Sequence, residues 1–239
     1  GQVYYNNAGT MMDRNLGAKG VGSEDIYEAY GLFYQWGRKD PLIMSKNATS
    51  TSNASTYNSL NSNVAFVTME CDEETGTIAY TTKYPTQIIR GNETSGYDWL
   101  YKNHDSSLWG NTKTMYDPCP PGYKVPYRSE VVLYSNSPAE IPGWAYNPDD
   151  YNFTVGNPAA VYPLGGYITT GGQYNQYGVG TRLWSSRPAS GGDAGYNLRI
   201  FPNETDGGAS YGNGTKPSSN GFAVRCVTID SVPFENAEG

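Results

Sequence analysis

The chain has 239 residues with a net charge of −7, and only 16% of its residues are charged. This acidity argues against a nucleic acid or an anionic membrane surface as a partner, because both favour a basic protein face. No apolar run approaches the roughly 20 residues of a membrane-spanning helix. The start, "GQVYYNNAGTMMDR", has no signal-peptide pattern, so we expect Gly1 to be a processed or trimmed boundary.

The early part of the chain carries the only strong helical pattern. Residues 24–37, "EDIYEAYGLFYQWG", place apolar side chains three and four positions apart. Ser23 can cap this helix and Gly37 can end it. A second, short helix is expected after Ser129, through "EVVLYS".

The remaining elements are expected to be loops and short strands. Residues 45–63 form a Ser/Thr/Asn tract without periodicity, which indicates an exposed loop inside a polar insertion around 45–115. Residues 76–91, "GTIAYTTKYPTQIIRG", are expected to be extended. Short strands separated by turn residues are expected at 161–169, 181–187, 196–201 and 221–229. With 29 glycines and 15 prolines, the chain predicts an α+β class: early helices, a small late antiparallel sheet and much ordered loop.

Three cysteines raise the question of a disulfide. Cys119 lies in "DPCPPG", a rigid segment with three prolines, and Cys226 lies in the apolar "FAVRCV". These two either pair, which would imply an oxidising compartment, or stay buried as free thiols. Cys71 lies in the polar stretch "MECDEE", so we expect an exposed loop position that is readily alkylated.

Six motifs resemble one family in their order. They are "MDRNLGA" (12–18), "GLFYQWGRKDPL" (31–42), "YDWLYKN" (97–103), "LWGNTKTMYDPCPPGYKVP" (108–126), "LWSS" (183–186) and "GFAVRCV" (221–227). Together they resemble the major-paralogous-domain family (FISUMP) of bacterial surface proteins, in the versions found in gut Bacteroidales. The resemblance covers nearly the whole chain, so we expect one domain over residues 1–239.

The resemblance implies a C-type-lectin-like fold of the formylglycine-generating-enzyme branch, on a secreted, cell-surface protein. Members occur at the ends of pilus-tip or lipoprotein adhesins, and some relatives are variable proteins of diversity-generating retroelements. The fold brings its first and last strands together, and a Cys119–Cys226 bridge would tie its long loop region to the sheet. Lys124, just after the Cys119 segment, is expected on a solvated face.

Catalytic patterns are weak in this chain. His104 is the only histidine and lies in a polar loop without a nucleophile motif, so we expect it to be exposed or hydrogen-bonded. The enzymes on the lectin-like branch need two reactive cysteines near the C-terminus, whereas this chain has Cys226 alone there. Carboxylate pairs for glycoside hydrolysis exist and are expected to be solvated loop acids: Asp149–Asp150, Asp72–Glu73–Glu74 and Glu24–Asp25.

Metal and cofactor signals are also weak. "NPDDYN" (147–152) offers oxygen ligands in a turn, which suits a structural calcium ion but lacks the EF-hand pattern. No Cys/His spacing supports zinc. We therefore expect no cofactor, with a structural calcium ion as the alternative.

The stretch 184–226 is the expected ligand-binding region. It is rich in Asn, Tyr, Ser, Gly and Asp, the residue types of adaptable binding loops, although the same residues also form ordinary loops. In "GYNLRIF" the alternation sends Tyr196, Leu198 and Ile200 to the core and the intervening side chains outward. The candidate ligand-binding residues are Tyr174, Tyr177, Arg187, Asp193, Asn197, Arg199, Phe201, Asn203, Tyr211 and Asn213.

The resulting hypothesis is a non-enzymatic adhesin domain on the bacterial surface. It would bind a host or microbial protein or glycan through its C-terminal loop surface, with pilus subunits as further partners. The rival hypotheses are a hydrolase acting on carbohydrate or peptide, and a structural pilus subunit. Trp184, in "LWSS", is assigned to the core rather than to the binding surface.

Overall fold

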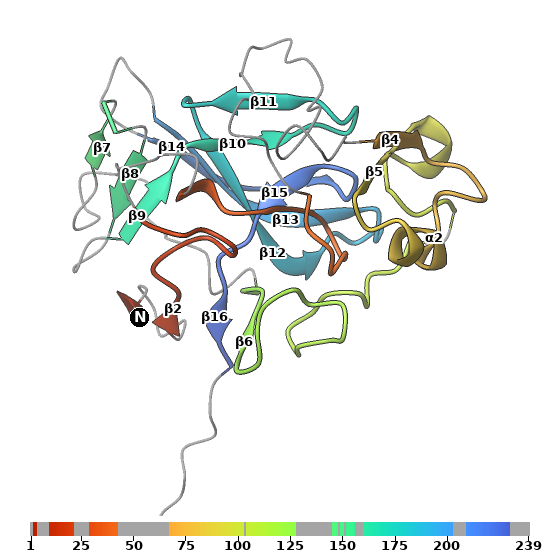
Figure 1. Cartoon of the computed structure of the whole chain (residues 1–239), viewed down its shortest axis with the longest axis horizontal. Coiled ribbons are helices and arrows are strands. Elements are labelled where there is room, and N and C mark those ends of the chain that lie inside the picture. The colour runs from red at the N-terminus through yellow and green to blue at the C-terminus, as the bar shows by residue number, and fades with distance from the viewer. Residues whose placement is uncertain are drawn as a thin grey trace, which may run out of the picture.

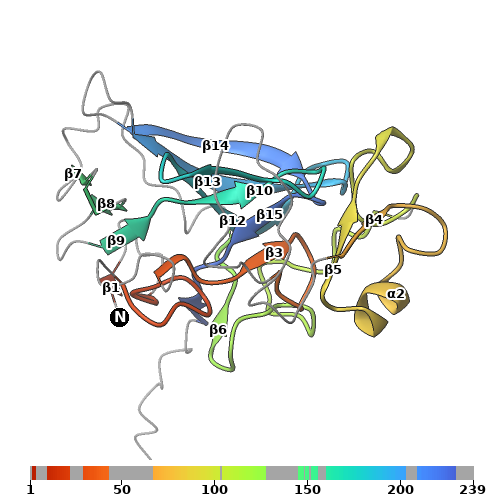
Figure 2. The ribbon, with the colours of Figure 1, turned by 45° about the horizontal axis from the view of Figure 1, so that its top comes forward.

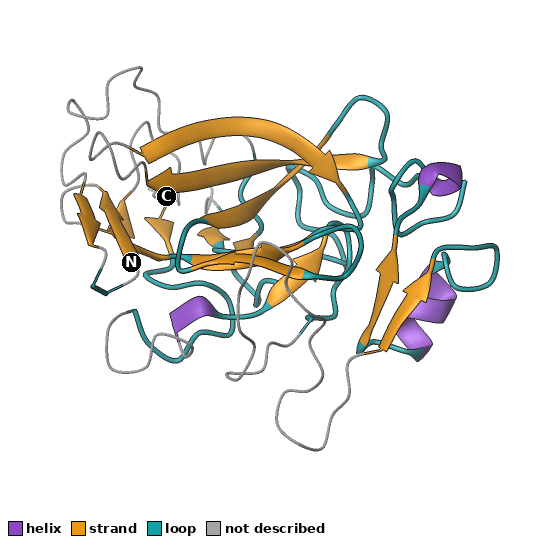
Figure 3. Cartoon of the chain, turned by 90° about the horizontal axis from the view of Figure 1, so that it is seen from above, coloured by secondary structure: helices purple, strands orange, loops and turns teal. Residues whose placement is uncertain are grey.

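The computed structural model describes residues 2–3, 10–21, 29–42, 67–102, 104–127, 145–147, 149–150, 152–155, 160–202 and 209–229. Strands dominate this part of the chain, as Figure 3 shows, and the helical content is small. The architecture is mostly β, with several antiparallel pairings and the short helix α2 (Ile78–Lys83), which is compatible with the expected α+β class.

A seven-stranded sheet occupies the centre of the molecule (Figure 1). Six strands follow one another in the order β11 (Tyr174–Tyr177), β10 (Gly165–Ile168), β15 (Gly221–Ala223), β12 (Thr181–Pro188), β13 (Ala194–Pro202) and β14 (Ala209–Pro217). The seventh, β3 (Phe33–Gln35), pairs antiparallel with β15. Strands are present within each of the expected ranges 161–169, 181–187, 196–201 and 221–229, but β11 and β14 form where loops were expected, so the sheet is larger than predicted.

The centre of this sheet is buried on both faces. The first core gathers side chains of one face with those of a neighbouring hairpin: Met11, Phe153, Ala160, Tyr162, Leu164, Leu183, Leu198, Ile200, Ala223 and Val227. Trp184 follows Leu183 in β12, so it points to the opposite face and is fully buried there. With both faces covered, β12 is buried from Thr181 to Ser186, polar residues included.

The opposite face packs into a second core, here called the tryptophan core. Its buried residues are Tyr34, Trp36, Cys71, Ile89, Trp99, Leu100, Leu108, Trp109, Cys119, Val125, Trp184, Phe222, Val224 and Cys226. Each of its four indole N–H groups donates to a backbone carbonyl, for example Trp184 Nε1 to Tyr34 O at 2.7 Å. These bonds remove the cost of burying an unpaired indole donor.

A four-stranded sheet joins the two ends of the described chain. Its order is β1 (Gln2–Val3), β2 (Thr10–Met11), β16 (Val227–Thr228) and β6 (Tyr123–Lys124). The last strand thus lies between an N-terminal strand and the strand that follows Cys119, in the lower part of Figure 1.

Two smaller units flank the central sheet on opposite sides, as both Figure 1 and Figure 2 show. One is a compact unit of β4 (Val67–Glu70), α2 and β5 (Gln87–Arg90), in which the two strands run parallel. The other is an antiparallel meander of β7 (Ala145–Asn147), β8 (Asn152–Val155) and β9 (Ala160–Pro163). A 3-10 turn, η1 (Glu93–Ser95), follows β5.

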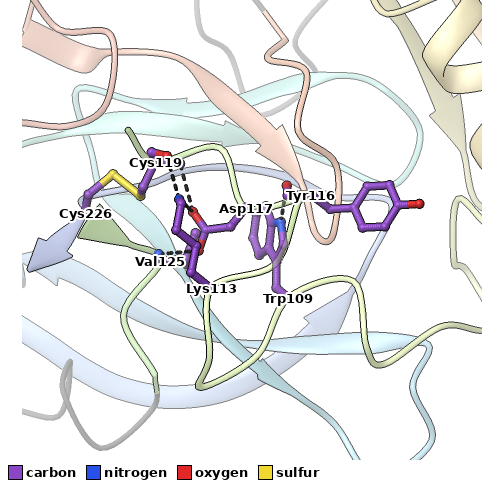
Figure 4. Close-up of a disulfide and its surroundings, with 7 residues drawn as sticks. All are labelled: Trp109, Lys113, Tyr116, Asp117, Cys119, Val125 and Cys226. Atoms are coloured by element: carbon purple, nitrogen blue, oxygen red, sulfur yellow. Dashed lines mark hydrogen bonds and ion pairs between the residues drawn. A yellow bond between two sulfur atoms is a disulfide. The ribbon is translucent and has the colours of Figure 1, made fainter. Parts of the chain in front are cut away.

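The Cys119–Cys226 disulfide is present, with a Cα–Cα distance of 5.9 Å, and confirms the predicted pairing (Figure 4). The proline-rich segment around Cys119 is held by the buried carboxylate of Asp117. This carboxylate accepts hydrogen bonds from the backbone N–H groups of Cys119 and Val125 and from Lys113 Nζ, at 2.8–2.9 Å. The rigid segment therefore presents the Cys119 thiol to β16 in a fixed orientation.

The predicted helix over 24–37 is wrong for its second half. Ala29 and Tyr30 are helical, but Gly31 has φ +74° and the chain then enters β3. A Cβ on Gly31 would lie 2.7 Å from the Leu16 carbonyl oxygen, so glycine alone fits this turn. All three residues of β3 are buried, and pairing with β15 overrides their helical spacing.

Other expectations are corrected in smaller ways. Residues 78–83 form α2 instead of an extended segment, because Thr77 caps it by accepting from the Tyr80 N–H, whereas 87–90 form the expected strand.

Cys71 is buried in the tryptophan core, with its thiol 3.3 Å from the Trp99 carbonyl oxygen. Lys124 is also buried, and its ammonium donates to the Asn111 carbonyl. The tract 45–63 and the helix expected after Ser129 lie outside the described residues.

Candidate functional site

Three cations gather on one face of β12, β13 and β14. Arg182 of β12 lies opposite Arg199 of β13, and Lys216 of β14 lies opposite Gly195. Residues opposite one another in antiparallel strands share a face, and alternate residues of one strand do too. Here the cationic face denotes these three side chains and their neighbours Tyr167, Asn197 and Phe201.

Arg182 is the buried centre of the cationic face. Only 8% of the surface of Arg182 is exposed. The guanidinium lies over the rings of Tyr167, Phe201 and Phe222, at 5.1–5.7 Å from their centroids. One of its nitrogens donates to Asn197 Oδ1 at 3.0 Å, but Nε has no hydrogen-bond partner among the described residues. Burial lowers the pKa of this guanidinium.

The other two cations are more accessible. Arg199 is exposed, and its guanidinium lies 4.7 Å from the centroid of the Phe201 ring. Lys216 is half-buried, and its pKa is lowered by burial and by the charges of Arg182 and Arg199. The three like charges are therefore close enough to destabilise one another.

No described carboxylate pairs with these cations. The ion pairs found within the described ranges lie elsewhere, as in Arg14–Asp13, Arg90–Glu70 and Lys113–Asp117. The cationic face is thus a locally positive surface on a chain whose net charge is −7.

The structure brings together three of the predicted ligand-binding residues, Asn197, Arg199 and Phe201. Their alternation with the core residues Leu198 and Ile200 is confirmed. Asn197, however, is 1% exposed instead of outward-facing, because its amide links Arg182 to the Gly214 carbonyl. Phe201 is 8% exposed instead of open, because the two arginines cover its ring.

Tyr174 and Arg187 make contacts outside the cationic face. Tyr174 is a core residue: its hydroxyl donates to the Gly165 carbonyl at 2.6 Å, and its ring meets Phe33 edge-on. Arg187 lies 5.0 Å from the Tyr196 ring centroid, so Tyr196 is half-buried rather than in the core.

Asp193 precedes β13, in the turn beside His104 and Gly96, and it is half-buried there. Tyr177, Tyr211 and Asn213 are described by their backbone alone, in β11 and β14. Asn203 lies outside the described residues.

Sequence reasoning missed Arg182, Lys216 and Tyr167. Arg182 directly precedes the "LWSS" motif and lies just outside the stretch 184–226 that was expected to bind the ligand. Pairing the predicted strands 181–187 and 196–201 as a hairpin would have put Arg182 beside Arg199. Neither Lys216 nor Tyr167 lies in a sequence pattern that signals this face.

His104 forms the most unusual polar contact outside this face. Its Nδ1 lies 2.9 Å from Asp98 Oδ2, and Asp98 is 1% exposed. Burial raises the pKa of Asp98 to about 6. No described serine, threonine or cysteine side chain hydrogen-bonds to the imidazole, so these two residues do not form a nucleophile–base pair with a described residue.

The predicted acidic pairs that the structure describes lie in turns, where their carboxylates cap the turn or are exposed to solvent. Asp72 accepts from the backbone N–H groups of Glu74 and Thr75 and so caps a turn. Asp149 and Asp150 are exposed in the β7–β8 turn, next to a hydrogen bond from Asn147 Nδ2 to Asn152 Oδ1. Glu24–Asp25 lie outside the described residues, and the described part of the chain holds no cluster of three acidic, histidine or cysteine side chains that suits a metal.

A cavity of about 520 Å³ lies beside the start of α2, between Glu73, Thr77, Leu100 and Asp105. It is separate in sequence from the expected binding region.

No protein-family model matches the chain, and comparisons with curated proteins and with solved structures find no match either. Among the described residues, no helix is long and apolar enough to cross a membrane.

Proposed function

We propose that this chain is a non-enzymatic ligand-binding domain of a bacterial surface adhesin, with a C-type-lectin-like fold. The observation that carries the proposal is where the six family-like motifs lie. Every buried residue of the tryptophan core except Cys71 and Ile89 comes from one of them. In the first motif, Asn15 bonds to the Tyr30 carbonyl and to Arg225 of the last motif.

The arrangement of the chain ends also supports this fold. The paired β2 and β16 are what a lectin-like fold requires of its first and last strands. The disulfide then ties the segment at Cys119 to the last strand. Such a bridge persists in oxidising compartments, which supports a location outside the cell, at a cell surface or a pilus tip.

The ligand surface of the proposed adhesin is the cationic face and its surroundings, formed by residues of 184–226 together with Arg182 and Tyr167. The motif residues form the rigid frame, and the strands β13 and β14 between them carry polar and aromatic side chains. Rigid elements hold binding side chains more precisely than loops do. The partner is a host or microbial surface protein or glycan.

A binding screen tests this function. The purified chain is displayed on beads and probed against arrays of surface proteins and glycans, and then against host cells. We expect at least one ligand, whose binding falls at least tenfold in the double variant Arg199→Gln/Lys216→Gln. The matched control is Lys83→Gln on α2, which removes a cation outside the cationic face. A ligand that binds the double variant normally would contradict the proposed surface.

A further inference from the structure

We infer that the cationic face binds an acidic polysaccharide, whose sulfate or carboxylate groups pair with Arg182, Arg199 and Lys216. This inference rests on the proposed function and names the class of ligand for its surface.

The buried charge of Arg182 is the first observation behind it. A guanidinium has five N–H donors, and a buried charge is costly unless it is paired and hydrogen-bonded. Arg182 has an Asn197 oxygen and the Tyr167 side chain as hydrogen-bonding neighbours, but no described carboxylate, an unpartnered buried Nε and two like charges nearby. An oxyanion bound at this place would supply the missing negative charge.

Arg38 shows that the fold can neutralise a buried arginine differently. It is 3% exposed, and its guanidinium donates to Gln35 Oε1 and to the carbonyls of Gln87 and Pro85. These oxygens accept hydrogen bonds from a guanidinium whose role lies within the fold. Arg182 has fewer such acceptors among the described residues, namely Asn197 Oδ1 and the Tyr167 side chain, and the Nε of both arginines has no partner there. The difference between the two is that Arg182 lies beside two further cations.

The aromatic rings favour a polysaccharide over a peptide. Peptide and protein interfaces rely on apolar anchors in pockets. Here the guanidiniums of Arg182 and Arg199 cover the Phe201 ring, and Phe222 is fully buried. What remains accessible is charge and hydrogen-bond donors, which suit sulfate and carboxylate groups.

The face is also open beside these groups. Gly214 of β14 lies opposite Asn197 and is exposed, and a Cβ placed on it would meet nothing within 4 Å. An extended, unbranched chain can therefore lie along β14 and reach Arg199 and Lys216.

Titration calorimetry with defined oligomers tests the inference. The probes are a heparin octasaccharide, which carries sulfate, and an octamer of galacturonic acid, which carries carboxylate. Maltooctaose is the neutral control, and a glutamate octapeptide represents an acidic peptide. We expect one or both acidic sugars to bind, more weakly at higher salt because exposed charges are screened, and maltooctaose not to bind.

Variants locate the binding. Arg199→Gln and Lys216→Gln should each weaken the acidic sugar at least fivefold, whereas Lys83→Gln should stay within twofold. Arg182→Gln should also weaken it, but the accessible pair keeps the test valid if that variant fails to fold. The inference is overturned if neither acidic sugar binds, if both accessible variants bind normally, or if the glutamate octapeptide binds as tightly as the sugars.

The outcome is separable from that of the proposed adhesin function. A neutral ligand that is lost in the Arg199/Lys216 double variant would retain the adhesin and reject the acidic sugar. If the acidic sugar binds at the face but the double variant still attaches to cells normally, the acidic-sugar inference is retained and the proposed adhesin function of this face is rejected.

Discussion

Leu198 and Arg199 are neighbours in β13 that point to opposite faces of the sheet. Leu198 is 2% exposed in the first core, whereas Arg199 is exposed. Leu198→Ala should lower the free energy of unfolding by about 2–5 kcal/mol through lost burial and a cavity. Arg199→Gln should change it by no more than about 0.5 kcal/mol. Urea unfolding of the two variants measures both values, and equal losses would show that the strand register is incorrect.

Cys71 combines a polar sequence context with a buried position. Burial raises the pKa of its thiol to about 11, so little reactive thiolate forms at neutral pH. Its alkylation by iodoacetamide at pH 8 should be at least about 100-fold slower in the native chain than in denaturant, because reaction requires local opening. Mass spectrometry of timed samples measures the rates. Rapid native alkylation would instead place the thiol at the surface.

Asp98 makes stability depend on pH. Burial raises the pKa of Asp98 in the folded chain to about 6, against 3.8 for an aspartate that is fully exposed to solvent, as in the unfolded chain. The folded state therefore holds this proton more tightly, and the stabilisation is greatest below pH 3.8 and is lost as the pH rises through 6.

Asp98→Asn removes this titration. Relative to the variant, the native chain should lose up to about 3 kcal/mol of unfolding free energy between pH 4 and pH 6, at 1.36 kcal/mol per pKa unit. Chemical denaturation at several pH values measures the two profiles. Parallel profiles would show that Asp98 does not titrate in this range.

The disulfide connects two elements that are far apart in the sequence. Cys119 and Cys226 are separated by 107 residues, and the chain-entropy model gives about 4–5 kcal/mol of stabilisation for a loop of this length. The double variant Cys119→Ala/Cys226→Ala should lose free energy of unfolding on that scale. Cys71→Ala, which removes a buried thiol without a bridge, serves as the control and should cost about 1 kcal/mol. Equal losses would mean that the bridge itself contributes little.

The strands show what a sequence can and cannot predict. Alternation between turn residues was sufficient to predict β10, β12, β13 and β15. It was not sufficient for Phe33–Gln35, since apolar residues three and four apart fit either a helix face or a strand buried on both sides. Partners distant in the sequence decided between the two, because β3 pairs with β15.

The cationic face was only partly predictable for the same reason. Arg199 could be assigned from the alternation of β13 alone. Asn197 could not, because its burial depends on Arg182, which comes from a neighbouring strand. Gln35 is similar: it is buried because its amide bonds to the backbone of Ile89 and Ser219, from two other parts of the chain.

The assembled molecule has two cores that meet across the central sheet. The six motifs were sufficient to predict the burial of Trp184 and the pairing of Cys119 with Cys226, but not that Cys71 would be buried beside them. They contribute Leu183, Ala223 and Val227 to the first core, but they do not include Phe153 and Tyr162 of the β8–β9 hairpin, which complete it. The motifs thus predict the rigid frame of the molecule, whereas the cationic face depends on residues that lie between the motifs.

The covalent loop closed by the disulfide has a mechanical consequence. It encloses β12, β13 and β14, and therefore the whole cationic face. Tension between the two ends of the chain passes through the sulfur–sulfur bond and bypasses this segment. Some 107 residues, roughly 350 Å of contour length at 3.3 Å per residue, cannot be drawn out while the bond lasts. Under tension, the terminal strands β1, β2 and β16 can separate while the cationic face stays inside the closed loop.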